Sequence, residues 1–176
     1  MPRNTFYYYY LKFRIVTTLV AMLFVFPTFL VAQHDFLYKT PLDFFDLPNS
    51  LEGNEVQEIY QDQIGYMWFA SKAGLVRYDG RDFQVYRHRA SDSTSISFDA
   101  VETILETRDG TMWIGTWGGG LNRLDRQTGE FTRFEKSADN PNGLNNNFVA
   151  DLVEDPAGNI WIATRNGLYK LDPETE

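Results

Sequence analysis

The stretch that decides the fold reads GYMWFASKAGLVRYD at residues 65–79. The chain repeats it as GTMWIGTWGGGLNRLD at 110–125 and as GNIWIATRNGLYKLD at 158–172. The tryptophans that open the three copies are 113 − 68 = 45 and 161 − 113 = 48 residues apart. Self-similarity at a period of about 20–50 residues is the signature of a repeat protein, so each copy is expected to form one structural unit.

Each repeat contains signals for four short strands separated by turns. A first strand follows a polar turn residue, and the Trp run, the Leu-to-Asp run and a final aromatic run supply the other three. The expected first strands cover 56–60, 101–105 and 149–153, and the expected fourth strands cover 82–86 and 130–134. Four antiparallel strands in about 45 residues is the size of one β-propeller blade. A β-sandwich is the alternative all-β fold, but it does not explain the self-repeat.

The residues that recur in every copy are interpreted as structural. One four-stranded sheet cannot bury both of its faces alone, so large indole rings are expected to fill the space between stacked sheets. Glycine adopts a positive φ at little cost, as a tight turn requires. The structural set comprises the tryptophans Trp68, Trp113 and Trp161, the turn glycines Gly65, Gly110 and Gly158, and the closing aspartates Asp79, Asp125 and Asp172.

Composition and charge exclude several classes of protein. The chain has 176 residues, of which 16% are aromatic and 23% charged, as is typical of a folded domain. It has no cysteine, which excludes disulfides, thiol nucleophiles and Cys-based zinc sites. Residues 1–32 hold three basic residues and no acidic one, so the remainder carries 16 − 3 = 13 basic and 24 acidic residues. Such an acidic body lacks the basic patch that binds nucleic acid.

The N-terminus has the order of a secretory signal. Lys12 and Arg14 precede an apolar run that extends from Ile15 to Ala32, and the sequence then turns polar. A hydrophobic signal helix is therefore expected over residues 1–32. An uncleaved membrane anchor is the alternative, because a run of about 18 residues approaches the length of a membrane helix. Both interpretations place the rest of the chain outside the cytoplasm.

The repeats divide the chain into five parts. These are the leader at 1–32, an N-terminal segment at 33–50, blade 1 at 51–94, blade 2 at 95–142 and a partial blade 3 at 143–176. The segment 33–50 is a candidate ring-closing strand, because its Phe36-x-Tyr38 resembles the strand that ends the later repeats. Closed propellers have about 4–8 blades, so about three blades form an incomplete ring. The chain is expected to be truncated, with uncovered sheet edges and faces that favour self-association.

The turn between the Trp strand and the Leu strand differs most between copies, and binding residues concentrate on such variable loops. Trp117 is an aromatic residue out of register with the other tryptophans. A sugar could stack on it, while Lys72, Arg165 or Asn166 donates hydrogen bonds. The alternative is that Trp117 packs against a neighbouring blade. No catalytic set, metal-ligand spacing, phosphate loop or cofactor motif is found, so no enzyme activity is expected in this chain.

The repeats resemble those of the two-component regulator propeller family, whose unit runs Asp-x-x-Gly-x-x-Trp and later Gly-Leu…Asp. Asp62-x-x-Gly65-x-x-Trp68 and Asp155-x-x-Gly158-x-x-Trp161 match this unit. The second copy departs from it, because Thr107 takes the position of the first Asp and Asp109 stands just before Gly110. The final portion is met by Gly74-Leu75…Asp79, Gly120-Leu121…Asp125 and Gly167-Leu168…Asp172.

The resemblance implies a periplasmic sensor of a membrane-bound hybrid histidine kinase. Many such sensors control polysaccharide utilisation, so an oligo- or polysaccharide ligand is expected. The remaining blades and the kinase modules of a full-length protein are the other expected partners, and the membrane is reached only through the leader or a further transmembrane helix. A secreted propeller enzyme acting on polysaccharide, such as a lyase or glycosidase, is one alternative function. A protein-interaction propeller is the other.

Overall fold

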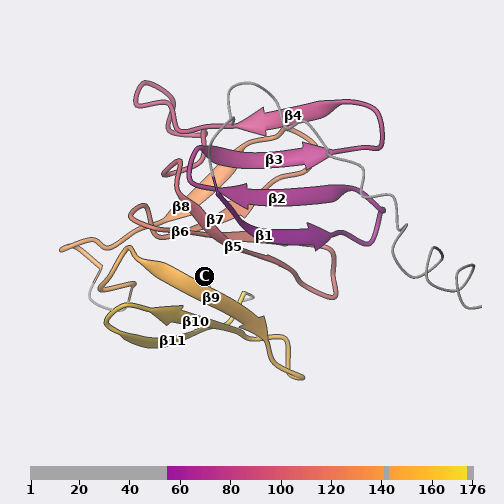
Figure 1. Ribbon diagram of the computed structural model, residues 1–176. Helices are drawn as coiled ribbons and strands as arrows, with labels where there is room; N and C mark the ends of the chain where they lie inside the picture. The colour runs from indigo at the N-terminus through magenta and orange to yellow at the C-terminus, as the bar shows by residue number, and fades with distance from the viewer. Residues whose placement is uncertain (1–54, 141–142, 174–176) are drawn as a thin grey trace, which may run out of the picture. The chain divides into compact units, whose positions relative to one another are not determined.

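A computed structural model describes residues 55–140 and 143–173 (Figure 1). The expected leader and the N-terminal segment 33–50 lie outside these residues. Three antiparallel sheets account for the strands. The first contains β1 (Val56–Gln61), β2 (Met67–Ser71), β3 (Gly74–Tyr78) and β4 (Phe83–Tyr86). The second contains β5 (Val101–Glu106), β6 (Met112–Thr116), β7 (Leu121–Leu124) and β8 (Phe131–Phe134). The third contains β9 (Val149–Glu154), β10 (Ile160–Thr164) and β11 (Gly167–Leu171).

Each sheet is a meander in which consecutive strands pair, in the orders β1-β2-β3-β4, β5-β6-β7-β8 and β9-β10-β11. The expected strand ranges agree with the observed ones to within one residue, so the prediction of four-stranded, antiparallel propeller blades is confirmed. The pairing of the first two strands is irregular at the start of every sheet. No helix occurs in the residues that the structure describes, and hence none there could cross a membrane.

The core lies between the sheets and has two parts. One cluster joins Trp68, Ala70 and Leu75 of the first sheet to Met112 and Ile114 of the second. The other cluster lies between the opposite face of the second sheet and the third sheet. The second sheet contributes Trp113 and Leu121, and the third sheet and the segment before it contribute Leu144, Val149, Leu152, Ile160 and Ile162. The second sheet is therefore covered on both faces. Trp161 occupies the same register as Trp68 and Trp113 but is exposed, because no described sheet covers its side of the third sheet.

An aspartate holds both the first turn and the tryptophan of the first sheet. One carboxylate oxygen of Asp62 accepts hydrogen bonds from the backbone N–H groups of Ile64, Gly65 and Tyr66, at 3.1, 2.9 and 2.8 Å. The other oxygen accepts the indole N–H of Trp68 at 2.8 Å. We call this arrangement the Asp–Trp anchor. Gly65 has a φ of 103°, and nothing lies within 4 Å of where its Cβ would stand, so the turn needs glycine for its backbone conformation.

The anchor recurs in the third sheet and is missing from the second. Asp155 accepts the indole N–H of Trp161 at 3.0 Å. Thr107 stands in the equivalent position of the second sheet, and its hydroxyl donates to Asp109 at 2.5 Å. The indole N–H of buried Trp113 consequently has no partner. A buried donor without an acceptor destabilises a protein by about 1–3 kcal/mol.

Restoring the anchor in the second sheet should stabilise the chain. The double variant Thr107→Asp, Asp109→Ala places at these two positions the residues that the third repeat has there. It gives the indole of Trp113 an acceptor and avoids two aspartates in one turn. We expect a free energy of unfolding higher by about 1 kcal/mol than that of the control Asp109→Ala, measured by urea denaturation. Equal stability of the two variants would contradict this assignment.

The anchor of the third sheet should make stability depend on pH. The hydrogen bond from Trp161, followed by those from Asn159 and Ala157, lowers the pKa of Asp155 from 3.8 to about 2. Because this pKa is depressed in the folded state, the stabilisation is present above the unfolded value and is lost as the pH falls toward the folded value.

We expect the free energy of unfolding to fall between about pH 5 and pH 2, and to fall less steeply in Asp155→Asn. Urea titrations at several pH values measure both curves. The other carboxylates are common to the two proteins, so parallel curves would show that Asp155 has no depressed pKa.

Candidate functional site at the turn end of the sheets

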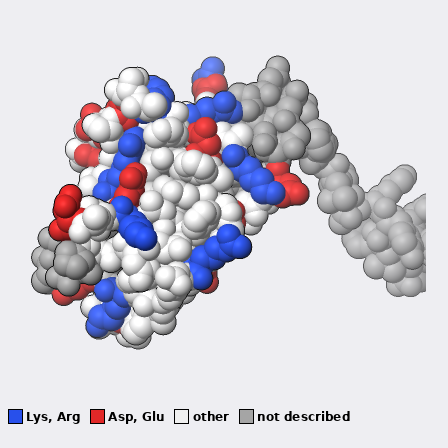
Figure 2. Space-filling view, turned by 90° about the vertical axis from the view of Figure 1, so that its left-hand side faces the viewer, with Lys and Arg blue, Asp and Glu red and all other residues white. Residues whose placement is uncertain are grey.

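The turns β2–β3, β6–β7 and β10–β11 lie at one end of the strands, together with the segments that lead from one sheet to the next (Figure 1). We call this end the turn rim. Figure 2 looks onto it and shows uncharged side chains in the middle, with charged side chains of both signs around them. The turn rim carries all four candidate ligand-binding residues of the sequence analysis.

Three of these candidates occupy one equivalent position in successive repeats. Lys72, Trp117 and Arg165 each follow the last residue of the Trp strand, which is Ser71, Thr116 or Thr164. The three therefore form a row along the turn rim. The repeated strands place the three residues at equivalent positions, while the side chains differ from one repeat to the next.

Lys72 is engaged in an ion pair at its end of the row. Its ammonium donates to the carboxylate of Glu55, and both side chains are exposed. The hydrogen bond with Glu55 and then its charge raise the pKa of Lys72, with a smaller contribution from the charge of Glu102. An exposed pair of this kind adds little to stability. Lys72 stays accessible beside Glu55, with 53% of its side chain exposed.

Trp117 and Arg165 are brought together by Phe148, which lies in the segment between the second and third sheets. The rings of Trp117 and Phe148 meet edge to face, with centroids 5.2 Å apart. The guanidinium of Arg165 lies 5.3 Å from the centroid of Trp117 and 5.7 Å from that of Phe148. Backbone bonds fix the cluster, since the N–H of Arg165 donates to the carbonyl of Phe148 at 3.0 Å and that of Trp117 to Ala100 at 2.7 Å.

Trp117 thus packs against the neighbouring sheet and still presents a partly exposed ring. The ring meets Phe148 edge to face and is 36% exposed, so it has a packing partner and remains accessible. Asn166 follows Arg165 in the same turn and is exposed; its backbone N–H donates to the hydroxyl of Thr164 at 3.3 Å. We call Trp117, Phe148 and Arg165 the rim cluster.

Phe98 and Phe148 are rim residues that sequence reasoning missed. Phe98 is exposed, and its ring covers Gly118, where an added Cβ would come within 3.3 Å of the ring. Both phenylalanines stand in the connections between sheets, where the other repeat has Asn146 and Ala100 in the equivalent positions. The signal in the sequence was an aromatic residue at a position where the other repeat has none.

The three-glycine run beside Trp117 allows close backbone packing and does not form an anion site. The N–H groups of Gly118 and Gly120 both donate to the carbonyl of Asn147, at 3.0 and 2.9 Å. The N–H of Gly119 donates to the hydroxyl of Thr116 at 3.1 Å. All three donors are used internally. A Cβ at Gly120 would lie 2.3 Å from the carbonyl oxygen of Phe134, so side chains are excluded by close backbone approach.

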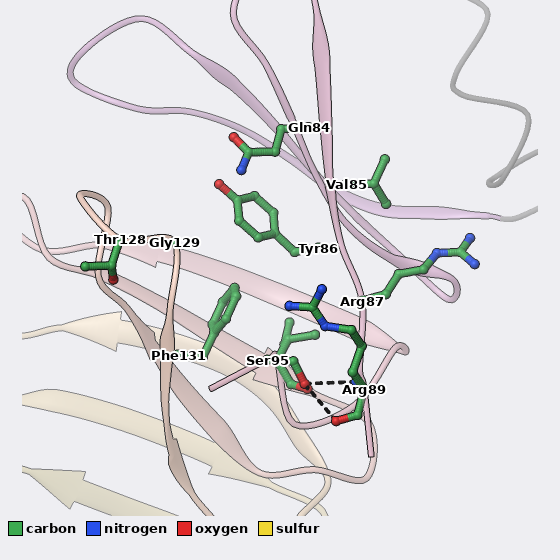
Figure 3. A pocket seen from close by; sticks show the side chains of 10 residues that line it. Gln84, Val85, Tyr86, Arg87, Arg89, Ser95, Thr128, Gly129 and Phe131 are labelled. Atoms are coloured by element: carbon green, nitrogen blue, oxygen red, sulfur yellow. Dashed lines mark hydrogen bonds between the residues drawn. The ribbon is translucent and has the colours of Figure 1, made fainter. Parts of the chain in front are cut away.

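A cavity of about 490 Å³ opens between the outer strands β4 and β8. Figure 3 shows the rings of Tyr86 and Phe131 facing each other across it, with Gln84 and Thr128 beside them, while Arg87 extends away. Tyr86 stacks on Trp68 at 6.0 Å and meets Phe131 edge to face at 5.6 Å. Burial raises the pKa of its hydroxyl. Both rings belong to the core between the first and second sheets, so we assign this cavity to the packing of the sheets and not to ligand binding.

The polar side chains at and near this cavity are bonded within the fold. The hydroxyl of Ser95, which lines the same cavity, accepts the N–H of Arg89 at 2.9 Å and donates to backbone carbonyls. His88 contacts the carbonyl of Ile96 at 3.0 Å. Over residues 55–140 and 143–173, no three His, Cys, Asp or Glu side chains gather as metal ligands would.

Parts of the chain are similar to known proteins in sequence. The sequence model of the two-component regulator propeller matches residues 95–118 and 143–166. Histidine kinase P4 of Formosa agariphila is 40% identical over 65 residues, which are 36% of this chain and 4% of that protein.

Two solved structures from B. thetaiotaomicron are similar to the fold. The extracellular domain of the hybrid two-component system BT3049 superposes with a TM-score of 0.68 at 27% identity, covering 76% of this chain and 19% of that one. The extracellular domain of the one-component system BT4673 superposes with a TM-score of 0.57, also at 27% identity, covering 69% of this chain and 17% of that one. The chain therefore spans less than a fifth of either structure. The matched segments lie in the second and third repeats, and these repeats are similar to those of the two-component regulator propeller family.

Proposed function

We propose that the chain is part of the ligand-sensing propeller of a periplasmic two-component regulator, and that its rim cluster binds an oligosaccharide. The observation that carries the proposal is the guanidinium of Arg165, 5.3 Å from the ring centroid of a partly exposed Trp117. An exposed aromatic face beside a cluster of hydrogen-bond donors is the usual composition of a site that orients a polar ligand. The extracellular domains to which the chain is similar support a location outside the cytoplasm.

The chemistry of the rim cluster suits a sugar. The apolar face of a sugar ring can lie on the exposed part of the indole, while hydroxyl or carboxylate oxygens accept hydrogen bonds from the guanidinium. Arg165 is held over two rings and by a backbone bond, so little side-chain freedom is lost on binding. Lys72 and Asn166 stand on the same rim and could add donors to a longer oligosaccharide.

The proposed role is recognition followed by signalling, without catalysis in this chain. The similarity to Histidine kinase P4 supports a connection to kinase modules and a phosphorelay. In this proposal the remaining blades complete the sensor, and a membrane helix joins it to kinase modules on the inner side of the membrane. A change in the rim on ligand binding would then be the signal that the kinase receives.

Replacing the stacking platform should weaken binding. We expect Trp117→Ala to reduce the affinity for an oligosaccharide, identified from a panel of neutral and acidic oligosaccharides, by on the order of tenfold, or about 1.4 kcal/mol. Isothermal titration calorimetry measures the affinity. Trp161→Ala is the matched control, because Trp161 is 38% exposed and Trp117 36%, but Trp161 lies on a sheet face away from the turn rim.

Thermal unfolding of both variants checks that they fold. An affinity of Trp117→Ala equal to that of the unchanged chain would rule out stacking on this ring. The absence of binding to every member of the panel by the unchanged chain would exclude an oligosaccharide ligand for this part of the sensor.

A further inference from the structure

The guanidinium of Arg165 is held in place without an anionic partner. It lies 5.3 Å from the ring centroid of Trp117 and 5.7 Å from that of Phe148, and the side chain is exposed. Over residues 55–140 and 143–173, no carboxylate lies within ion-pair distance of this guanidinium, and no oxygen accepts a hydrogen bond from it. The fork of N–H donors that an arginine carries is therefore available to a ligand.

Other arginines of the chain are paired with carboxylates. Arg89 donates to the carboxylate of Asp92 at 2.7 Å, and Arg126 donates to that of Asp62 at 3.2 Å. The chain has 24 acidic residues and 16 basic ones, so carboxylates are in excess. Arg165 is nonetheless without one among the described residues. An anion from outside the chain can take that place, because an ionised acceptor makes the strongest hydrogen bonds with a guanidinium.

The segments that form the rim cluster contain no acidic residue. They are 116–120, 144–149 and 163–168. The segment equivalent to 144–149 in the preceding connection is 96–101, and it contains Asp99. The positive charge of Arg165 is therefore not neutralised by its own cluster, although the chain as a whole is acidic. A local positive charge of this kind attracts an anionic ligand.

An amide replaces a carboxylate beside the rim cluster without a change of structural role. The backbone N–H of His88 donates to the side chain of Asp99 at 2.7 Å. At the equivalent place in the next repeat, the backbone N–H of Lys136 donates to the side chain of Asn147 at 2.6 Å. The carbonyl of Asn147 accepts the N–H of Gly118, which places this residue against the turn of the rim cluster. The bond is thus kept and the negative charge is absent next to Arg165.

Exposed aromatic rings lie beside the guanidinium. Trp117 is 36% exposed and Phe98 43%. The ring of Phe98 covers Gly118, the residue that follows Trp117. A small inorganic anion bound to Arg165 would leave these rings unused. An acidic oligosaccharide uses both features, because its sugar rings have C–H faces that pack on aromatic rings while its acidic group meets the guanidinium.

A carboxylate is the acidic group that fits an arginine fork best. Its two oxygens accept two parallel N–H bonds from a planar guanidinium, which fixes the orientation as well as the charge. The stacking of Arg165 on Trp117 and Phe148 orients the guanidinium before a ligand arrives. Little side-chain freedom is therefore lost when the carboxylate binds.

We propose that the rim cluster selects an acidic oligosaccharide, in which the carboxylate of a uronic acid unit binds the guanidinium of Arg165 and the neighbouring unit stacks on Trp117. The exposed ring of Phe98 extends the aromatic surface for a further unit. This inference rests on the proposed function, since it names the charge class of the oligosaccharide that the same site takes.

Isothermal titration calorimetry of the whole chain tests the charge class. The probes are trisaccharides of galacturonate, mannuronate and glucuronate, each titrated beside its methyl ester, which keeps the sugar rings and removes the charge. We expect at least one acid to bind about tenfold or more tightly than its ester, because charged hydrogen bonds are replaced by weaker neutral ones. The acid-to-ester ratio of affinities should shrink at high salt, which screens exposed charges.

Three variants assign the effect to the rim cluster. Arg165→Gln should bring the ratio close to one. Asn147→Asp restores the carboxylate that the preceding connection has and keeps an acceptor for the N–H of Lys136, so it should lower the ratio about threefold by repulsion. Gln127→Glu is the matched control, because it adds the same charge at an exposed position in the hairpin between β7 and β8, at the other end of the strands. It should leave the ratio unchanged.

The outcomes separate this inference from the proposed function. Binding of the esters with a ratio near one in the unchanged chain would overturn the charge class and leave an oligosaccharide site in place. Absence of binding by the acids, the esters and the neutral oligosaccharides alike would exclude both. A ratio that Gln127→Glu lowers as much as Asn147→Asp does would also overturn the inference, since the net charge of the chain would then account for the preference.

Discussion

Each of the three described sheets carries apolar side chains on both faces, and the covered faces among them are covered by another sheet. The second sheet is covered on both faces within the described residues, with one core cluster on each side. The first and third sheets have one covered face and one open face. Hydrophobic burial scales with the area removed from water, so the same residue type stabilises the fold fully at Trp113 and only in part at Trp161. The packing of sheets thus determines stability, and in the first and third sheets the Asp–Trp anchor adds a hydrogen bond to the indole.

The same frame explains how function can vary. The repeated strands hold the positions of Lys72, Trp117 and Arg165 constant, and the side chains at those positions are free to differ. In the second and third repeats the difference creates the rim cluster, since Phe148 replaces the alanine found in the preceding connection. Recognition chemistry accumulates on the turn rim because changes there leave the core packing intact.

The period of the sequence was enough to predict the fold, because a 45-residue spacing of tryptophans and turn glycines leaves one all-β architecture that accounts for it. The departure at Thr107 was visible as well, but its consequence was not, since an unpartnered indole N–H depends on side-chain directions. The rim cluster could be predicted only in part: Trp117 and Arg165 were candidates, whereas Phe98 and Phe148 depend on contacts between segments far apart in the chain.

Native-state hydrogen exchange tests most directly the claim that each sheet depends on its neighbours. We expect amides of β6 and β7 in the second sheet to exchange only through global unfolding. Those of β10 and β11 should exchange through a local opening of lower free energy, because one face of their sheet is uncovered. Equal opening free energies across all three sheets would contradict the account, since the third sheet would then be as stable with one covered face as the second is with two.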